Sequence, residues 1–169
     1  MKKIMILLSS ALILSAGVVD ISKKKEDSTS SLAKEVRDLS KNLTNKELAG
    51  VIAIEIDKTA PYKIDSITTL NKGVVSIDNE IVLTHTIDSV GTKKLLSNVL
   101  KKEINTIPQK FFNNLSGTLF NSTRSSICMN DFSREVLKHN ITYRYKYLLD
   151  NKKLVSEFTI ENNDCIPYD

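Results

Sequence analysis

Glycine, proline, tryptophan and cysteine are all scarce in this chain. Of its 169 residues, 5 are Gly, 3 are Pro, 2 are Cys and none is Trp. So little glycine and proline excludes a collagen-like chain, and an apolar content of 41% excludes a disordered one. The 24 basic residues exceed the 20 acidic residues only slightly, which does not indicate a nucleic-acid-binding protein. The composition is that of one globular domain.

Motifs that would indicate a known chemistry are also absent. The sequence has no Gly-rich phosphate loop, no Gly-x-Ser-x-Gly turn and no cluster with the ligand spacing of a zinc site. We therefore predict no cofactor, no metal and no catalytic residue. His85 is expected to be a strand residue satisfied by a neighbour, His139 to lie at a helix C-terminus, and Asp65 to fix the start of a strand. A hydrolase that pairs Asp65 with a second carboxylate stays open, because such pairs form in space rather than in sequence.

The N-terminus has the pattern of a secretory signal. Positive charge at Lys2 and Lys3 precedes an apolar stretch, and small residues follow at 15–17. We predict a signal peptide over residues 1–17, a polar linker over 18–31 and a single domain over 32–169, with a periplasmic or secreted destination. The alternative is a single-pass membrane anchor, since the lysines at 23–25 favour keeping that side of the segment in the cytosol. Contact with a membrane would then be made only through the uncleaved segment.

Cys128 and Cys165 are the two cysteines of the chain. An even number in an exported protein predicts one disulfide, which would close a loop of about 38 residues and contribute about 4 kcal/mol in the chain-entropy model. The alternative is a pair of buried thiols in a reducing cytosol.

Helical periodicity is found in the first third and in the middle of the chain. One helix is expected from Leu32, and a capping box at Thr44-x-x-Glu47 begins a second. The stretch 48–56 also alternates as a strand would, and we favour the helix there. Thr92 is expected to cap a helix that buries an apolar stripe, Leu95, Leu96, Val99, Leu100 and Ile104. Further helices are expected around Phe111-Phe112, a pair that suits the core or a docking contact, and over 129–139.

Two segments instead alternate with a period of two. The first is a hairpin of 73–77 and 80–88, turning at Asp78-Asn79, and the second joins 141–149 to 154–160. The predicted fold is α+β, an antiparallel sheet built from two β-hairpins with helices packed on one face and one disulfide.

A row of tyrosines in the second hairpin is the candidate binding surface. Tyr143, Tyr145 and Tyr147 share one face of their strand, and Arg144 lies between them on the other. Tyrosine combines apolar area with a hydroxyl group, which suits a sugar, a peptide or an anionic surface. The alternative is that this face packs under the helices.

One resemblance emerges from these segments. The run Pro61-x-x-Ile64-Asp65-x-x-Thr68-Thr69-Leu70, and later Cys128, residues 141–147 and Asp164-Cys165, resembles a group of small uncharacterised exported proteobacterial proteins. The resemblance covers roughly residues 60 to 165 and implies export, a disulfide and a compact domain, but no activity. We predict a non-enzymatic periplasmic or envelope module that binds an envelope protein. The alternatives are the membrane-anchored protein and a small hydrolase or lectin-like binder that uses the tyrosine face.

Overall fold

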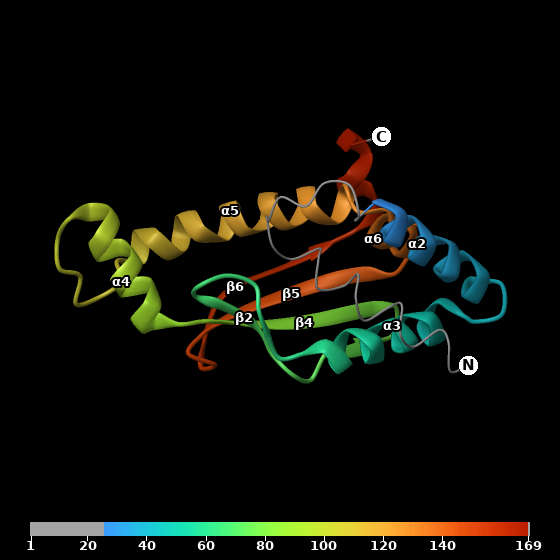
Figure 1. Ribbon diagram of the computed structural model, residues 1–169, viewed down its shortest axis with the longest axis horizontal. Coiled ribbons are helices and arrows are strands. Elements are labelled where there is room, and N and C mark those ends of the chain that lie inside the picture. The colour runs from blue at the N-terminus through green and yellow to red at the C-terminus, as the bar shows by residue number, and fades with distance from the viewer. Residues whose placement is uncertain (1–25, 169) are drawn as a thin grey trace.

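The computed structural model describes residues 26–168, so the expected signal peptide and most of the expected linker lie outside the described residues. The described chain has the predicted α+β fold, with a six-stranded sheet and helices packed against it (Figure 1). The strands are β1 (Tyr62–Lys63), β2 (Thr68–Leu70), β3 (Val75–Ile77), β4 (Glu80–Ile87), β5 (Thr142–Leu149) and β6 (Lys153–Ile160). The helices are α2 (Glu26–Ser40), α3 (Asn45–Thr59), α4 (Ser89–Leu100), α5 (Gln109–Cys128), α6 (Asp131–Lys138) and the 3-10 helix η1 (Asn162–Tyr168).

Both predicted hairpins are present, as β3–β4 and β5–β6. Their turns use residues with positive φ, Asp78 in the first and both Asp150 and Asn151 in the second. Asp and Asn tolerate this conformation better than most residues that have a side chain, so the second turn forms without the glycine that usually occupies it.

The sheet is mixed rather than purely antiparallel. Its order is β1-β2-β4-β5-β6, with β3 also paired to β4, and the central pair β4 and β5 is parallel. The reason is the connection, because a crossover through α4, α5 and α6 brings the chain back to the starting end of β4 before β5 begins. This pairing sets Leu83 opposite Tyr145 and His85 opposite Tyr147.

The helices cover one face of the sheet, as predicted. On that face Leu83, His85 and the three tyrosines of β5 are buried, and Phe120 of α5 packs edge-on against Phe158 of β6. The opposite face bears a row of charged side chains, in which Arg144 Nε lies 3.1 Å from a Glu80 carboxylate oxygen. One face therefore forms the core and the other is polar.

The first two helices pack together at the end of the domain where α6 lies (Figure 1). The capping box of α3 is confirmed, since Thr44 and Glu47 hydrogen-bond reciprocally. Helix α2 begins at Glu26, earlier than expected and inside the predicted linker, and buries Leu32. Arg37 of α2 donates a hydrogen bond of 2.9 Å to the buried Glu135 of α6, which links these helices.

The expectation for α4 is wrong in two respects. Asp88, not Thr92, caps the helix, with its carboxylate accepting hydrogen bonds from the backbone N–H groups of Val90 and Gly91. Thr92 is instead buried inside the helix. Much of the apolar stripe is exposed, with relative exposures of 44% at Leu95, 70% at Val99 and 56% at Leu100. The stripe stays uncovered because α4 lies at one end of the molecule, past the end of β4 (Figure 1).

The helix around Phe111 and Phe112 is longer than expected. Helix α5 begins after Pro108 and continues through the Ser/Thr-rich stretch to Cys128. Phe112 is buried and Phe111 half-buried, so the pair belongs mainly to the core.

The predicted disulfide is confirmed. Cys128 at the end of α5 is bonded to Cys165 in η1, with the two Cα atoms 5.2 Å apart. Both cysteines are buried, and the bond fixes the segment after β6 against α5. Among residues 26–168, no helix is long and apolar enough to cross a membrane.

Candidate functional site

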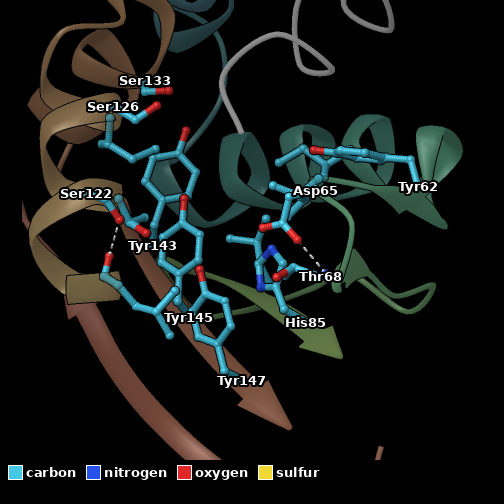
Figure 2. A pocket seen from close by; sticks show the side chains of 16 residues that line it. Tyr62, Asp65, Thr68, His85, Ser122, Ser126, Ser133, Tyr143, Tyr145 and Tyr147 are labelled. Atoms are coloured by element: carbon cyan, nitrogen blue, oxygen red, sulfur yellow. Dashed lines mark hydrogen bonds between the residues drawn. The ribbon is translucent and has the colours of Figure 1, made fainter. Parts of the chain in front are cut away.

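A cavity of about 200 Å³ lies on the helix-covered face of the sheet. Helix α5 forms one wall, the segment from Tyr62 to Thr68 forms the other, and β4 and β5 form the floor (Figure 2). Its polar lining residues are Tyr62, Asp65, Thr68, His85, Ser122, Thr123, Ser126, Ser133, Tyr143, Tyr145 and Tyr147, and its apolar ones are Ile56, Ile64, Leu83, Leu119 and Ile127.

The wall between β1 and β2 is held in shape by Asp65. One carboxylate oxygen of Asp65 accepts hydrogen bonds from the backbone N–H groups of Ile67, at 2.8 Å, and Thr68, at 2.7 Å. The structural role predicted for Asp65 is therefore confirmed. The same side chain also borders the cavity, where it supplies negative charge.

The floor is aromatic because β4 and β5 lie side by side. His85 stacks on Tyr147 with 4.8 Å between ring centroids and on Tyr145 with 5.7 Å. Phe158 of β6 extends the stack, 5.6 Å from Tyr145. Each ring comes from a strand position that points towards the helices, so the parallel register assembles the floor.

Burial makes this floor electrically neutral at pH 7. His85 is only 3% exposed, and burial lowers its pKa from 6.5 to about 4, so the imidazole carries no charge. Burial likewise raises the pKa of Tyr143, Tyr145 and Tyr147, which keeps their hydroxyl groups protonated.

Two buried polar atoms in this lining have no hydrogen-bond partner among the described residues. They are Nδ1 of His85 and the hydroxyl oxygen of Tyr143; the Leu83 backbone and the Ser133 side chain lie close to these two residues, but not in the geometry of an ordinary hydrogen bond to these atoms. An unsatisfied buried polar atom costs about 1–3 kcal/mol, so native proteins keep few of them without a functional reason. The cavity therefore suits an occupant that brings hydrogen-bonding groups as well as apolar area. The expectation that a neighbour satisfies His85 is met only in part, because the Leu83 backbone interacts with this side chain while Nδ1 has no hydrogen bond of ordinary geometry.

The structure separates the four residues of the predicted binding surface. Tyr143, Tyr145 and Tyr147 line the cavity together, while Arg144 lies on the opposite face of the sheet beside Glu80 and Glu157. The tyrosines are 2%, 8% and 5% exposed. The sequence allows the tyrosine row to be interpreted either as a binding surface or as a face packed under the helices. Each interpretation is partly right, because the rings are buried under the helices and still border a cavity.

Sequence reasoning did not place His85 beside the tyrosines, and in α5 it singled out only Phe111 and Phe112, not the side chains that border the cavity. The side chains of Ser122 and Ser126 reach the cavity from successive turns of that helix (Figure 2). Their spacing of four residues is the one signal that they share a helix face. Within residues 26–168, no group of three or more His, Cys, Asp or Glu side chains is arranged to hold a metal ion.

Comparisons with protein-family models and with curated proteins find no match. Among solved structures, the chain is similar to the type II secretion system pilotin AspS from Vibrio cholerae, with 16% sequence identity and a TM-score of 0.52, over 80% of this chain and 99% of that one. It is also similar to EpsS, the pilotin of the Vibrio vulnificus type 2 secretion system, with 14% identity and a TM-score of 0.51, over 81% of this chain and 97% of that one. At these identities the similarity establishes that the chain has the fold of these two pilotins.

Proposed function

We propose that this protein is a non-enzymatic accessory protein of the bacterial cell envelope that binds a segment of another envelope protein in the cavity between α5 and the β1–β2 wall. The observation that carries the proposal is the aromatic floor of the cavity, in which two buried polar atoms, His85 Nδ1 and the Tyr143 hydroxyl, lack a hydrogen bond of ordinary geometry. The fold shared with two secretion-system pilotins supports a more specific form, in which the partner is a component of a protein-secretion system.

The size and lining of the cavity favour a polypeptide segment. A volume of about 200 Å³ is below the range of about 300–1,000 Å³ that is common for small-molecule sites, and it suits one or two large side chains. Ile56, Leu83 and Leu119 offer apolar contact, and the side chains of Ser122, Thr123 and Ser126 on α5 add polar atoms to the lining. An anchoring apolar side chain with polar groups next to it matches this mixture.

The burial of the tyrosine rings argues against the lectin-like alternative. A sugar that stacks on an aromatic side chain needs an open ring face. The three tyrosine rings are at most 8% exposed, and His85 and Phe158 already stack against them. The hydroxyl groups, more than the ring faces, are what the floor offers to an occupant.

Site-specific photocrosslinking in cells tests this proposal. A photoreactive amino acid at Thr123, on the α5 wall, is expected to capture one envelope protein reproducibly, identified by mass spectrometry. The control position is Thr84, which alternates to the other face of β4 and is partly exposed. Capture of no partner at Thr123, or of the same partner at both positions, would contradict the proposal.

A matched pair of substitutions then tests whether the cavity itself is occupied. Ser122→Phe places a large ring at a lining position, whereas Asn121→Phe places the same ring at the preceding exposed position, which does not line the cavity. We expect Ser122→Phe to weaken binding of the captured partner about tenfold or more, and Asn121→Phe to leave it unchanged. Equal binding by both variants would place the interface elsewhere.

A further inference from the structure

Helix α4 exposes an apolar stripe along its last two turns. Leu95 and Val99 are one turn apart and share a face, and Leu100 follows about 100° further around the helix. Their exposures of 44%, 70% and 56% are high for apolar residues gathered at one end of a helix. The first turn of the helix is joined to the domain by a hydrogen bond of 2.9 Å from the Ser89 backbone N–H to the Asp150 carboxylate and by the buried Thr92.

The same end of the molecule is positively charged. The segment from 88 to 112 contains five lysines and two acidic residues, a net charge of +3, and Asp88 is engaged in capping. These lysines are Lys93, Lys94, Lys101, Lys102 and Lys110. All but Lys93 are exposed. Figure 1 shows α4 and the start of α5 at the end of the molecule opposite α2 and α6, so this surface is clear of the rest of the domain.

We propose that α4 binds the surface of an anionic lipid bilayer, with Leu95, Val99 and Leu100 entering the interfacial region and the neighbouring lysines contacting the headgroups. A helix with an exposed apolar face and a lysine-rich flank has the composition of an interfacial membrane-binding helix. Each lysine near an anionic surface adds attraction, and the apolar side chains add the burial that charge alone does not provide. Membrane contact through α4 does not depend on the cavity or on the N-terminal segment.

Charge also argues against a second copy of this chain as the partner that covers the apolar stripe of α4. A symmetric contact through α4 would place the same five lysines of each copy next to one another, with Asp88, Glu103 and Asp150 as the opposite charges nearby. Like charges brought together in this way repel each other. An anionic bilayer instead attracts the lysines through its headgroups and accepts the apolar side chains of α4 in its interface.

Vesicle binding by the protein recovered from the envelope tests the proposal. The probes are vesicles of phosphatidylcholine with about 30% phosphatidylglycerol, and vesicles of phosphatidylcholine alone. We expect at least tenfold tighter binding to the anionic vesicles, and a loss of this preference when NaCl is raised from about 0.05 M to about 0.5 M, because salt screens exposed charges. Equal binding to both vesicle types would overturn the proposal.

One double variant and two single-residue controls separate this helix from the rest of the protein. Val99→Gln with Leu100→Gln removes apolar area at exposed positions and is expected to weaken binding to anionic vesicles about tenfold or more. The controls are Val90→Gln, which is 73% exposed on the other side of the same helix, and Ile166→Gln, which is 63% exposed in η1. Each control is expected to bind like the unchanged protein. Since every form has the same N-terminus, any contribution from that segment cancels in the comparison.

The absence of tryptophan allows a direct measure of insertion. Val99→Trp is expected to shift its fluorescence to shorter wavelength when anionic vesicles are added, and Val90→Trp is expected not to shift. Identical responses from the two variants would overturn the proposal. So would a dimer in sedimentation that is lost with Val99→Gln and Leu100→Gln, because the stripe would then belong to a contact between copies of the chain.

Discussion

The burial of His85 predicts a loss of stability as the pH falls from 7 towards 4. Burial lowers the pKa of His85 from 6.5 to about 4 in the folded state. At pH values between these two, the unfolded chain binds a proton at His85 and the folded chain does not. Acidification in this range therefore favours unfolding. The stabilising contribution is fully present above about pH 7 and is lost as the pH falls towards 4.

The size of the effect follows from the same shift. One pKa unit corresponds to about 1.36 kcal/mol, so a shift of about 2.5 units costs about 3 kcal/mol once the pH is below 4. Between pH 7 and pH 5, the free energy of unfolding should fall by about 2 kcal/mol. This interval separates His85 from the side chains of Asp38, Asp57 and Asp150, whose pKa values are lowered by their hydrogen bonds and by nearby lysines and which titrate at lower pH.

Urea unfolding at a series of pH values measures this prediction. Because the chain has no tryptophan, circular dichroism or tyrosine fluorescence reports the transition. His85→Phe keeps an aromatic ring on the floor and removes the titration, so its stability should change by less than about 0.5 kcal/mol between pH 7 and pH 5. The control is His139→Asn at the chain's other histidine, which is expected to keep the full pH dependence. The reasoning would be refuted if the free energy of unfolding of the unchanged protein did not depend on pH. It would also be refuted if His85→Phe kept the pH dependence of the unchanged protein.

Three further predictions concern stability and processing. Replacing Cys128 and Cys165 together by Ser should lower the free energy of unfolding by about 4 kcal/mol, since the bond closes a long loop; a urea midpoint equal to that of the unchanged protein would contradict this. Thr44→Ala should cost about 1 kcal/mol through the lost cap of α3, measured in the same assay, and a change below about 0.3 kcal/mol would count against it. Intact-mass measurement should find a mature chain that starts at Val18 and resists alkylation until it is reduced, whereas an uncut chain with both thiols modified would favour the membrane-anchored alternative.

Features set by neighbouring residues could be predicted from the sequence. The capping box at Thr44, the two hairpins and the short helix before Asn140 each depend on interactions within a few residues, and each is present. The Cys128–Cys165 bond was predictable for a different reason, because two cysteines allow only one intramolecular pairing.

Features set by distant parts of the chain could not be predicted in this way. The parallel pairing of β4 and β5 is decided by a crossover of three helices, and without it nothing places His85 beside Tyr147. The cavity was missed for the same reason. The stripe of α4 shows the opposite error, because Leu95 and Val99 have the periodicity of a core helix in a place where no layer covers them.

The parallel pair at the centre of the sheet also makes β4 vulnerable while the protein is folding. Strand β4 can pair with β2 and β3 as soon as they emerge, but its other edge stays open until the whole of 88–141 has been made and β5 can dock. Unpaired strand edges are sites of aggregation between chains, and long-range pairings form slowly. Partly synthesised chains of this protein therefore expose an edge of β4 that can pair with other chains, although the finished sheet has β4 paired on both sides.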